Sequence, residues 1–69
     1  MKYDPAQVRI HEVYTVAIGD LGVHGEGIGS VDGFTVFVPG ALPGETVTAE
    51  IILLKKSYAL GKLLSIEQE

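Results

Sequence analysis

The chain has 69 residues, of which 46% are hydrophobic and 20% charged, and this composition is typical of one small globular domain with little room for both a core and a buried catalytic pocket. It contains no cysteine, which excludes disulfides, thiolate zinc sites, iron–sulfur ligation and a cysteine nucleophile within these residues. Its net charge of -4 by itself argues against nucleic acid as a partner.

The N-terminal segment is polar and has no features of a targeting signal. Residues 1–5 carry one basic residue and no apolar run follows them, unlike a secretory signal. The longest apolar stretch, residues 49–54, is interrupted by Glu50 and is far shorter than the roughly 20 residues that span a bilayer. We therefore expect a cytoplasmic protein with no membrane partner, in which residues 1–11 form a lead-in and residues 12–67 form the domain.

The first half of that domain has the pattern of two β-strands. Residues 12–21 are rich in β-branched and aromatic side chains that alternate with period two, which predicts a half-buried strand. Residues 22–29 contain four glycines and cannot form a regular helix, because each glycine costs about 1 kcal/mol there relative to alanine. This segment predicts a turn that enters a glycine-rich strand over residues 27–32, with a bend or a close backbone approach.

Turn signals separate the remaining strands. Asp32-Gly33 between two β-rich runs predicts a hairpin with a type I′ turn, followed by a strand over residues 34–38 that ends at a proline. Residues 39–44 form a loop with repeated Pro-Gly signals.

A fourth strand is expected over residues 45–54. Its alternation fails at residues 52–54, which indicates either a bulge or burial on both faces. A polar break at residues 55–57 leads into a fifth strand over residues 58–66.

Five short strands leave two sheet edges, and closing the sheet into a barrel removes both of them. We therefore predict an all-β fold, a small five-stranded antiparallel barrel like the oligonucleotide-binding fold. An SH3-like barrel is the alternative, because strand count alone does not separate the two architectures.

Residue patterns for catalysis and metal binding are weak in this chain. The glycine-rich residues 25–29 resemble a phosphate loop, but no helix follows to point its N-terminus at a phosphate, so a bend in a barrel strand is the better interpretation. His11 and His24 lie thirteen positions apart without a convincing set of carboxylates. No serine lies in a nucleophile elbow. We expect no catalytic residue, metal or cofactor in this chain, which by itself is not an enzyme.

A group of basic and aromatic side chains in the second half could bind RNA, since lysines contact phosphates and exposed aromatics stack on bases. The net charge of -4 lies entirely in residues 1–45, while residues 46–69 sum to zero, which leaves room for a small basic patch. The alternative is that the aromatic rings are core and the lysines solubilise a turn. At least one of Phe34 and Phe37 should point inward, because residues three apart face opposite sides of a strand. The group comprises Lys55, Lys56, Lys62, Tyr58, Phe34 and Phe37.

Four strings in this order and at this spacing resemble the TRAM domain family over roughly residues 11–66. They are DLGVHGEGIG at residues 20–29, VDGFTVFVPG at 31–40, LPGE at 42–45 and KKSYA at 55–59. The last two are most similar to the bacterial RNA uracil-5-methyltransferases, including enzymes that act on 23S ribosomal RNA, in which this domain opens the chain.

The resemblance implies an RNA-binding barrel that holds ribosomal or transfer RNA for the catalytic domain of the same polypeptide. That catalytic part would lie beyond Glu69 and would use S-adenosylmethionine and, in many members, a 4Fe-4S cluster. Because the chain is acidic, we expect its RNA binding in isolation to be weak. Family members commonly carry a basic residue where Ser30 stands here. The implied RNA-binding residues are Lys55, Lys56, Tyr58, Lys62, His24 and Phe34.

Three hypotheses of function follow. The first is the RNA-binding domain of an S-adenosylmethionine-dependent RNA uracil-5-methyltransferase. The second is a stand-alone TRAM protein that acts as a cold-shock-like RNA chaperone. The third is a protein-interaction barrel that docks through its acidic first half.

Overall fold

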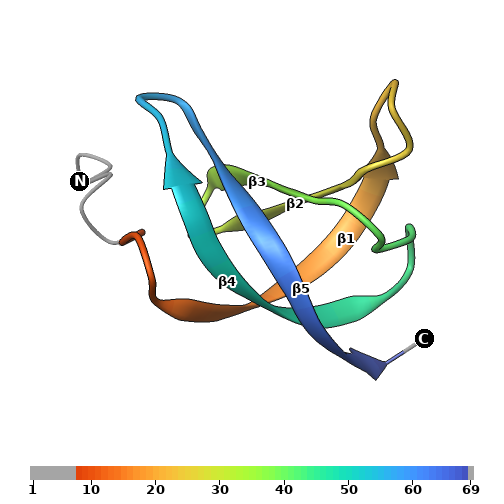
Figure 1. Cartoon of the computed structure of the whole chain (residues 1–69). Helices are drawn as coiled ribbons and strands as arrows, with labels where there is room; N and C mark the ends of the chain where they lie inside the picture. Colours follow the sequence, from red (N-terminus) through yellow and green to blue (C-terminus); the bar gives the residue numbers. More distant parts are fainter. Residues whose placement is uncertain (1–7, 69) are drawn as a thin grey trace.

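The computed structural model describes residues 8–68 and contains five β-strands. In chain order they are β1 (Val13–Leu21), β2 (Gly27–Val31), β3 (Phe34–Val38), β4 (Thr46–Leu54) and β5 (Tyr58–Gln68) (Figure 1). The strands close into a barrel in the order β1-β2-β3-β5-β4. Residues 8–68 contain no helix long and apolar enough to cross a membrane.

The closed barrel confirms the predicted all-β architecture and refines its strand directions. Four of the neighbouring pairs are antiparallel, while β3 and β5 run parallel. A ring with an odd number of strands cannot alternate direction at every pairing, so a five-stranded closed barrel must contain a parallel pair. The sheet is therefore mixed, and its parallel pairing brings the start of β5 beside the middle of β3.

The turn between β2 and β3 has the predicted geometry. Asp32 and Gly33 have φ angles of 51° and 83°, and positive φ at both central residues is what a type I′ turn requires. The two-residue turn pairs Val31 directly with Phe34, and both side chains are buried. Because successive strand residues alternate sides, this register turns Val36 and Val38 inward and Phe37 outward.

The connection between β3 and β4 is built from two successive turns, each with a proline followed by a glycine. Gly40 and Gly44 have φ angles of 92° and 93°, the left-handed region that the third position of a type II turn needs. Between them, Ala41 is fully buried, and its N–H donates to the carbonyl of Val38 at 3.2 Å. The loop thus completes the core with one small side chain.

The glycine-rich strand β2 allows β1 to approach closely. A Cβ atom at Gly29 would lie 2.5 Å from the carbonyl oxygen of Ala17 and 2.5 Å from Cγ1 of Val16. Opposite it, the β1–β2 register shifts between Ile18 and Asp20, so Gly19 is the extra residue of a bulge. The glycines therefore serve the tight coiling of the barrel, as the strand-bend interpretation predicted.

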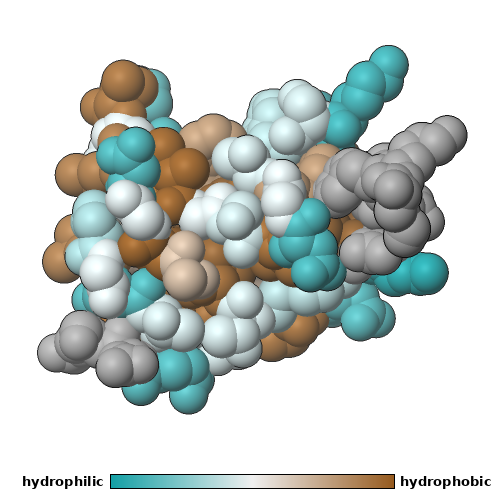
Figure 2. All heavy atoms as spheres, turned by 180° about the vertical axis from the view of Figure 1, so that it is seen from behind, coloured by the Kyte–Doolittle hydropathy of each residue, from teal (hydrophilic) through white to brown (hydrophobic). Residues whose placement is uncertain are grey.

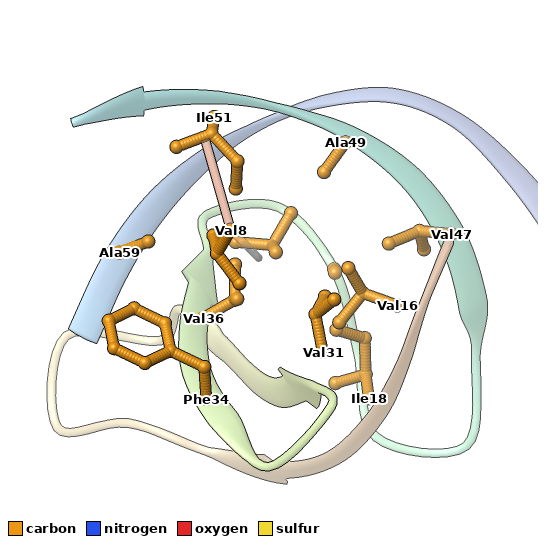
Figure 3. Close-up of a cluster of buried hydrophobic side chains, with 12 residues drawn as sticks. Val8, Val16, Ile18, Val31, Phe34, Val36, Val47, Ala49, Ile51 and Ala59 are labelled. Carbon is orange, nitrogen blue, oxygen red and sulfur yellow. The ribbon is translucent and has the colours of Figure 1, made fainter. Parts of the chain in front are cut away.

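The core lies inside the ring, with side chains from all five strands pointing toward its axis (Figure 3). It also includes Val8, which is fully buried although the sequence placed it in the lead-in. The N–H of His11 donates to the carbonyl of Ile51 at 2.7 Å, and the N–H of Ile51 donates to the carbonyl of Glu12 at 2.9 Å. Of the predicted lead-in, residues 8–11 therefore contact the barrel through the buried side chain of Val8 and the backbone of His11, and residues 1–7 lie outside the described part.

The end of β4 contains the predicted bulge. The register between β4 and β5 shifts between Ile51 and Leu53, so Ile52 is the extra residue. The alternative, burial on both faces, is wrong, because residues 52–54 are all exposed. On β5, Tyr58 and Lys62 are both exposed on the outer face, as expected for residues an even number of positions apart on a strand.

Candidate nucleic-acid interface

An aromatic pair lies on the outer face where β3 and β5 run side by side. The ring centroids of Phe37 and Tyr58 are 5.5 Å apart with an interplanar angle of 79°, which is an edge-to-face contact. Such pairs contribute about 0.5–1.5 kcal/mol beyond the area they bury. Phe37 is half-buried and Tyr58 is 38% exposed, so part of the ring surface stays open to solvent.

A hollow of about 550 Å³ lies beside this pair, and we call it the aromatic pocket. Its volume falls within the range of about 300–1,000 Å³ of small-molecule sites, so it has room for a nucleobase. Three separate parts of the chain line the pocket. The parallel β3–β5 pairing brings two of them together. The pocket is lined by residues 24–26, Phe37, Pro39, Gly40, Tyr58 and Leu60.

The tight loop between β1 and β2, which Figure 1 shows joining the two strands, contributes residues 24–26 to the lining of the aromatic pocket. The N–H of Gly22 donates to the carbonyl of Glu26 at 2.7 Å, and the N–H of Gly25 donates to the carbonyl of Gly22 at 3.0 Å. The carboxylate of Glu26 folds back over Gly22, where a side chain would overlap it, and its Oε1 accepts the N–H of His24 at 3.0 Å. The loop is therefore closed by its own hydrogen bonds, with His24 exposed at the pocket.

The lysine turn, residues 55–57, adjoins the other side of the aromatic pair. Lys55 and Lys56 are exposed, and the N–H of Lys55 donates to the carbonyl of Tyr58 at 2.8 Å. Seen from behind in Figure 2, hydrophilic atoms project at the end that carries the β4–β5 turn, while hydrophobic surface gathers toward the end of the β1–β2 loop. The two lysines therefore lie in the turn that leads directly into the half-open ring of Tyr58 at the start of β5.

Lys62 lies further along β5, in a more acidic setting. It is exposed and lies directly across from Glu50 of β4. The Nδ1 atom of His11 lies 3.8 Å from Glu50 Oε2. Lys62 also borders a second hollow that shares Pro39 and Leu60 with the aromatic pocket. A neighbouring carboxylate reduces the attraction that Lys62 offers to a phosphate.

The sequence-predicted site is brought together in part. Tyr58 and His24 line one pocket, and Lys55 and Lys56 lie in the turn next to Tyr58, although their role in RNA binding stays a prediction. Phe34, which was expected to contact RNA, lies in the core instead. It is 4% exposed, because the two-residue turn sets it opposite Val31.

Phe37 takes the place of Phe34 in the candidate site. Glu26 and Leu60 were missed, since the first was treated as part of a glycine-rich bend and the second as an ordinary strand residue. Only its position in the strand could have identified Leu60. Alternate residues of a strand lie on the same face, so Leu60 shares a face with Tyr58 and Lys62.

A separate polar cluster lies on the outer face of β4 and β5. The hydroxyls of Ser65 and Thr48 donate to Oε2 of Glu67 at 2.6 and 2.8 Å. These hydrogen bonds, that of Ser65 foremost, hold the pKa of the Glu67 carboxyl below its ordinary value. The cluster is anionic at neutral pH and is not a phosphate site. Across residues 8–68, no group of three or more His, Asp or Glu side chains is placed to hold a metal ion.

Two curated relatives are RNA methyltransferases much longer than this chain. The chain is 51% identical over 59 residues to an uncharacterized RNA methyltransferase of Clostridium acetobutylicum, an alignment that covers 86% of this chain and 13% of that protein. It is 39% identical over 66 residues to an uncharacterized RNA methyltransferase of Halalkalibacterium halodurans, covering 96% of this chain and 14% of that protein. The chain therefore spans 13–14% of the length of these relatives.

A solved structure shares the fold over nearly its whole length. The solution structure of a conserved protein of Methanococcus maripaludis superposes with a TM-score of 0.79 at 36% sequence identity, covering 93% of this chain and 89% of that one. The profile of the TRAM domain matches residues 6–64, which include every strand of the barrel down to the middle of β5. The chain belongs to the TRAM domain family.

Proposed function

We propose that this chain is an RNA-binding domain that holds substrate RNA for an S-adenosylmethionine-dependent RNA uracil-5-methyltransferase. Two findings support the proposal: its membership of the TRAM family and its similarity to parts of RNA methyltransferases. The observation that carries it is the half-open Phe37–Tyr58 pair, which borders a hollow on one side and the lysine turn on the other. Methyl transfer would take place in a different part of the same polypeptide.

The physical basis of binding is stacking together with a small electrostatic contribution. Stacking of a base on an aromatic side chain contributes about 1–3 kcal/mol. If Lys55 and Lys56 neutralise two phosphates of a single strand, the slope of log K against log salt is about -1.4, which weakens binding about sevenfold between 50 and 200 mM salt. The rest of the chain is acidic and repels phosphate, so a larger electrostatic contribution to RNA binding is not expected. The expected binding is thus weak and moderately sensitive to salt.

The test compares the salt dependence of RNA affinity in three forms of the chain. The first is the natural chain and the second is Lys55→Ala with Lys56→Ala. The third, Thr15→Glu with Ala17→Glu, lowers the net charge by the same amount on the exposed face of β1. Fluorescence anisotropy with a labelled single-stranded oligoribonucleotide at 50 and 200 mM salt measures the slope.

We expect the lysine variant to lose most of the slope and the β1 variant to keep it. The β1 variant controls for general charge repulsion, because it adds two negative charges away from the aromatic pocket. An equal loss of slope in both variants would show that the lysine turn makes no specific phosphate contact, and the proposed binding face would be wrong.

A second candidate function is a stand-alone RNA chaperone of the cold-shock type. The observation that favours it is the Methanococcus maripaludis protein, of which this fold covers 89%. The reading frame of the gene separates the two candidates. Continuation past the codon for Glu69 into a methyltransferase sequence would exclude the chaperone, and a stop codon there would exclude the positioning domain.

A further inference from the structure

The aromatic pocket contains one feature that phosphate binding does not explain. Glu26 is the one carboxylate among the described residues that line it, and it belongs to the β1–β2 loop. A carboxylate repels phosphate, so the RNA backbone belongs beside the lysine turn rather than inside the pocket. What enters the pocket should be an uncharged group that can donate hydrogen bonds.

The Glu26 carboxylate is held in a fixed position. Its Oε1 accepts the N–H of His24 at 3.0 Å, and the Glu26 carbonyl accepts the N–H of Gly22 at 2.7 Å. An ionised carboxylate only accepts hydrogen bonds and offers about four lone-pair positions on two oxygens. The hydrogen bond from His24 uses one of those positions, and Gly22 lies against one side of the carboxylate, so a ligand can offer a pair of donors from the side away from Gly22.

The four RNA bases differ in how well they match a two-oxygen acceptor. The Watson–Crick edge of guanine presents two adjacent donors, N1–H and the N2 amino group. Adenine and cytosine present one amino group next to a ring nitrogen acceptor. Uracil presents a single N–H between two carbonyl oxygens, which a carboxylate repels. Unpaired bases are read on this edge while they stack on aromatic side chains.

We propose that the aromatic pocket takes one unpaired guanine of the RNA, stacked on one ring of the edge-to-face Phe37–Tyr58 pair and bound through its N1–H and N2 amino group to Glu26. The inference rests on the proposed RNA-binding function and adds a base preference to it. The inference also distinguishes the nucleotide that this domain binds from the nucleotide that is methylated. The uracil to be methylated is the base that this pocket accepts worst, so the domain holds a neighbouring nucleotide and leaves the target free.

The test uses four five-nucleotide RNAs, UUGUU, UUAUU, UUCUU and UUUUU, titrated into ¹⁵N-labelled chain. A bidentate hydrogen-bonded contact discriminates between bases by roughly 5- to 160-fold. We therefore expect UUGUU to bind at least about fivefold more tightly than UUUUU, with the largest shifts at the amides of Tyr58 and Glu26. Adenine and cytosine should fall between them.

The decisive variant is Glu26→Gln, and the chain supplies a matched control. Glutamine still offers an oxygen to the N–H of His24, but it replaces one acceptor with a donor that opposes guanine. In the control, Glu45→Gln, the carboxylate also accepts a loop N–H, that of Leu42 at 2.8 Å, and it does not line the pocket. We expect Glu26→Gln to lower the ratio of guanine to uracil affinity to about one, and Glu45→Gln to leave it unchanged.

The outcomes separate the inference from the function on which it rests. Equal affinity for all four RNAs, or tighter binding of UUUUU, overturns the guanine site while RNA binding by the domain stands. If none of the four RNAs shifts any resonance, the proposed function fails and the inference fails with it. A preserved His24 amide resonance in Glu26→Gln confirms that the loop remains closed.

Discussion

The most informative stability experiment compares two glycines of the same hairpin. A Cβ atom at Gly29 of β2 would lie 2.5 Å from both the Ala17 carbonyl oxygen and Cγ1 of Val16, whereas a Cβ atom at Gly19 of β1 would meet nothing within 4 Å. Neither glycine has a positive φ, so alanine suits the backbone at both positions. The two substitutions Gly29→Ala and Gly19→Ala therefore differ in packing alone.

The two substitutions should change the stability of the fold in opposite directions. Overpacking a filled interior costs about 1–3 kcal/mol, and in a domain of 60–100 residues each kcal/mol shifts Tm by about 4–8 °C. Gly29→Ala should therefore lower Tm by about 4 to 24 °C. Replacing glycine by alanine at a compatible site stabilises by about 0.4–1 kcal/mol through the unfolded chain, so Gly19→Ala should raise Tm by a few degrees.

Thermal unfolding followed by circular dichroism, with urea titration as a second probe, measures both effects. The structural interpretation of the glycine-rich segment requires a stability difference between the two variants. A Gly29→Ala chain as stable as the natural one would refute it. Reduced RNA affinity at unchanged Tm would instead support a phosphate-binding role for these glycines, the interpretation that the sequence analysis set aside.

Three further predictions test other parts of the structure. Ser65→Ala should raise the pKa of Glu67 in an NMR pH titration. Because that pKa is depressed in the folded state, its stabilising effect is present above the ordinary carboxyl pKa and is lost as pH falls through the folded value. Val8→Ala should cost about 1.5–3 kcal/mol in urea unfolding, and no change would show that residues 8–11 do not complete the core. Asp32→Ala should cost about 1 kcal/mol, because alanine lacks the tolerance of aspartate for a φ of 51°; an unchanged urea midpoint would contradict this.

Local features of the fold could be predicted because their causes are local. Asp32-Gly33 produced the two-residue turn through its tolerance of positive φ, and the two Pro-Gly pairs of residues 39–44 produced the loop after β3. The failed alternation at residues 52–54 located the β4 bulge to within a residue. Each of these signals depends on residues that are neighbours in the chain.

Features that depend on distant pairings could not be predicted. Closing an odd number of strands requires a parallel pair, but the order of the strands in the ring decides which pair it is. Here β3 and β5 run parallel, which brings Phe37 beside Tyr58. Val8 is a single apolar residue in a polar segment, so no periodicity marked it as core. The choice of Phe37 over Phe34 as the exposed ring required the register of the hairpin, which strand patterns alone did not provide.

The central claim is that RNA binds across the aromatic pocket and the lysine turn, and shift mapping on the ¹⁵N-labelled chain tests it most directly. On addition of a single-stranded oligoribonucleotide at low salt, we expect the largest amide shifts at His24, Phe37, Lys56 and Tyr58. Thr15, on the exposed face of β1, should scarcely move. Shifts centred on β1, with His24, Lys56 and Tyr58 unmoved, would show that RNA binds elsewhere.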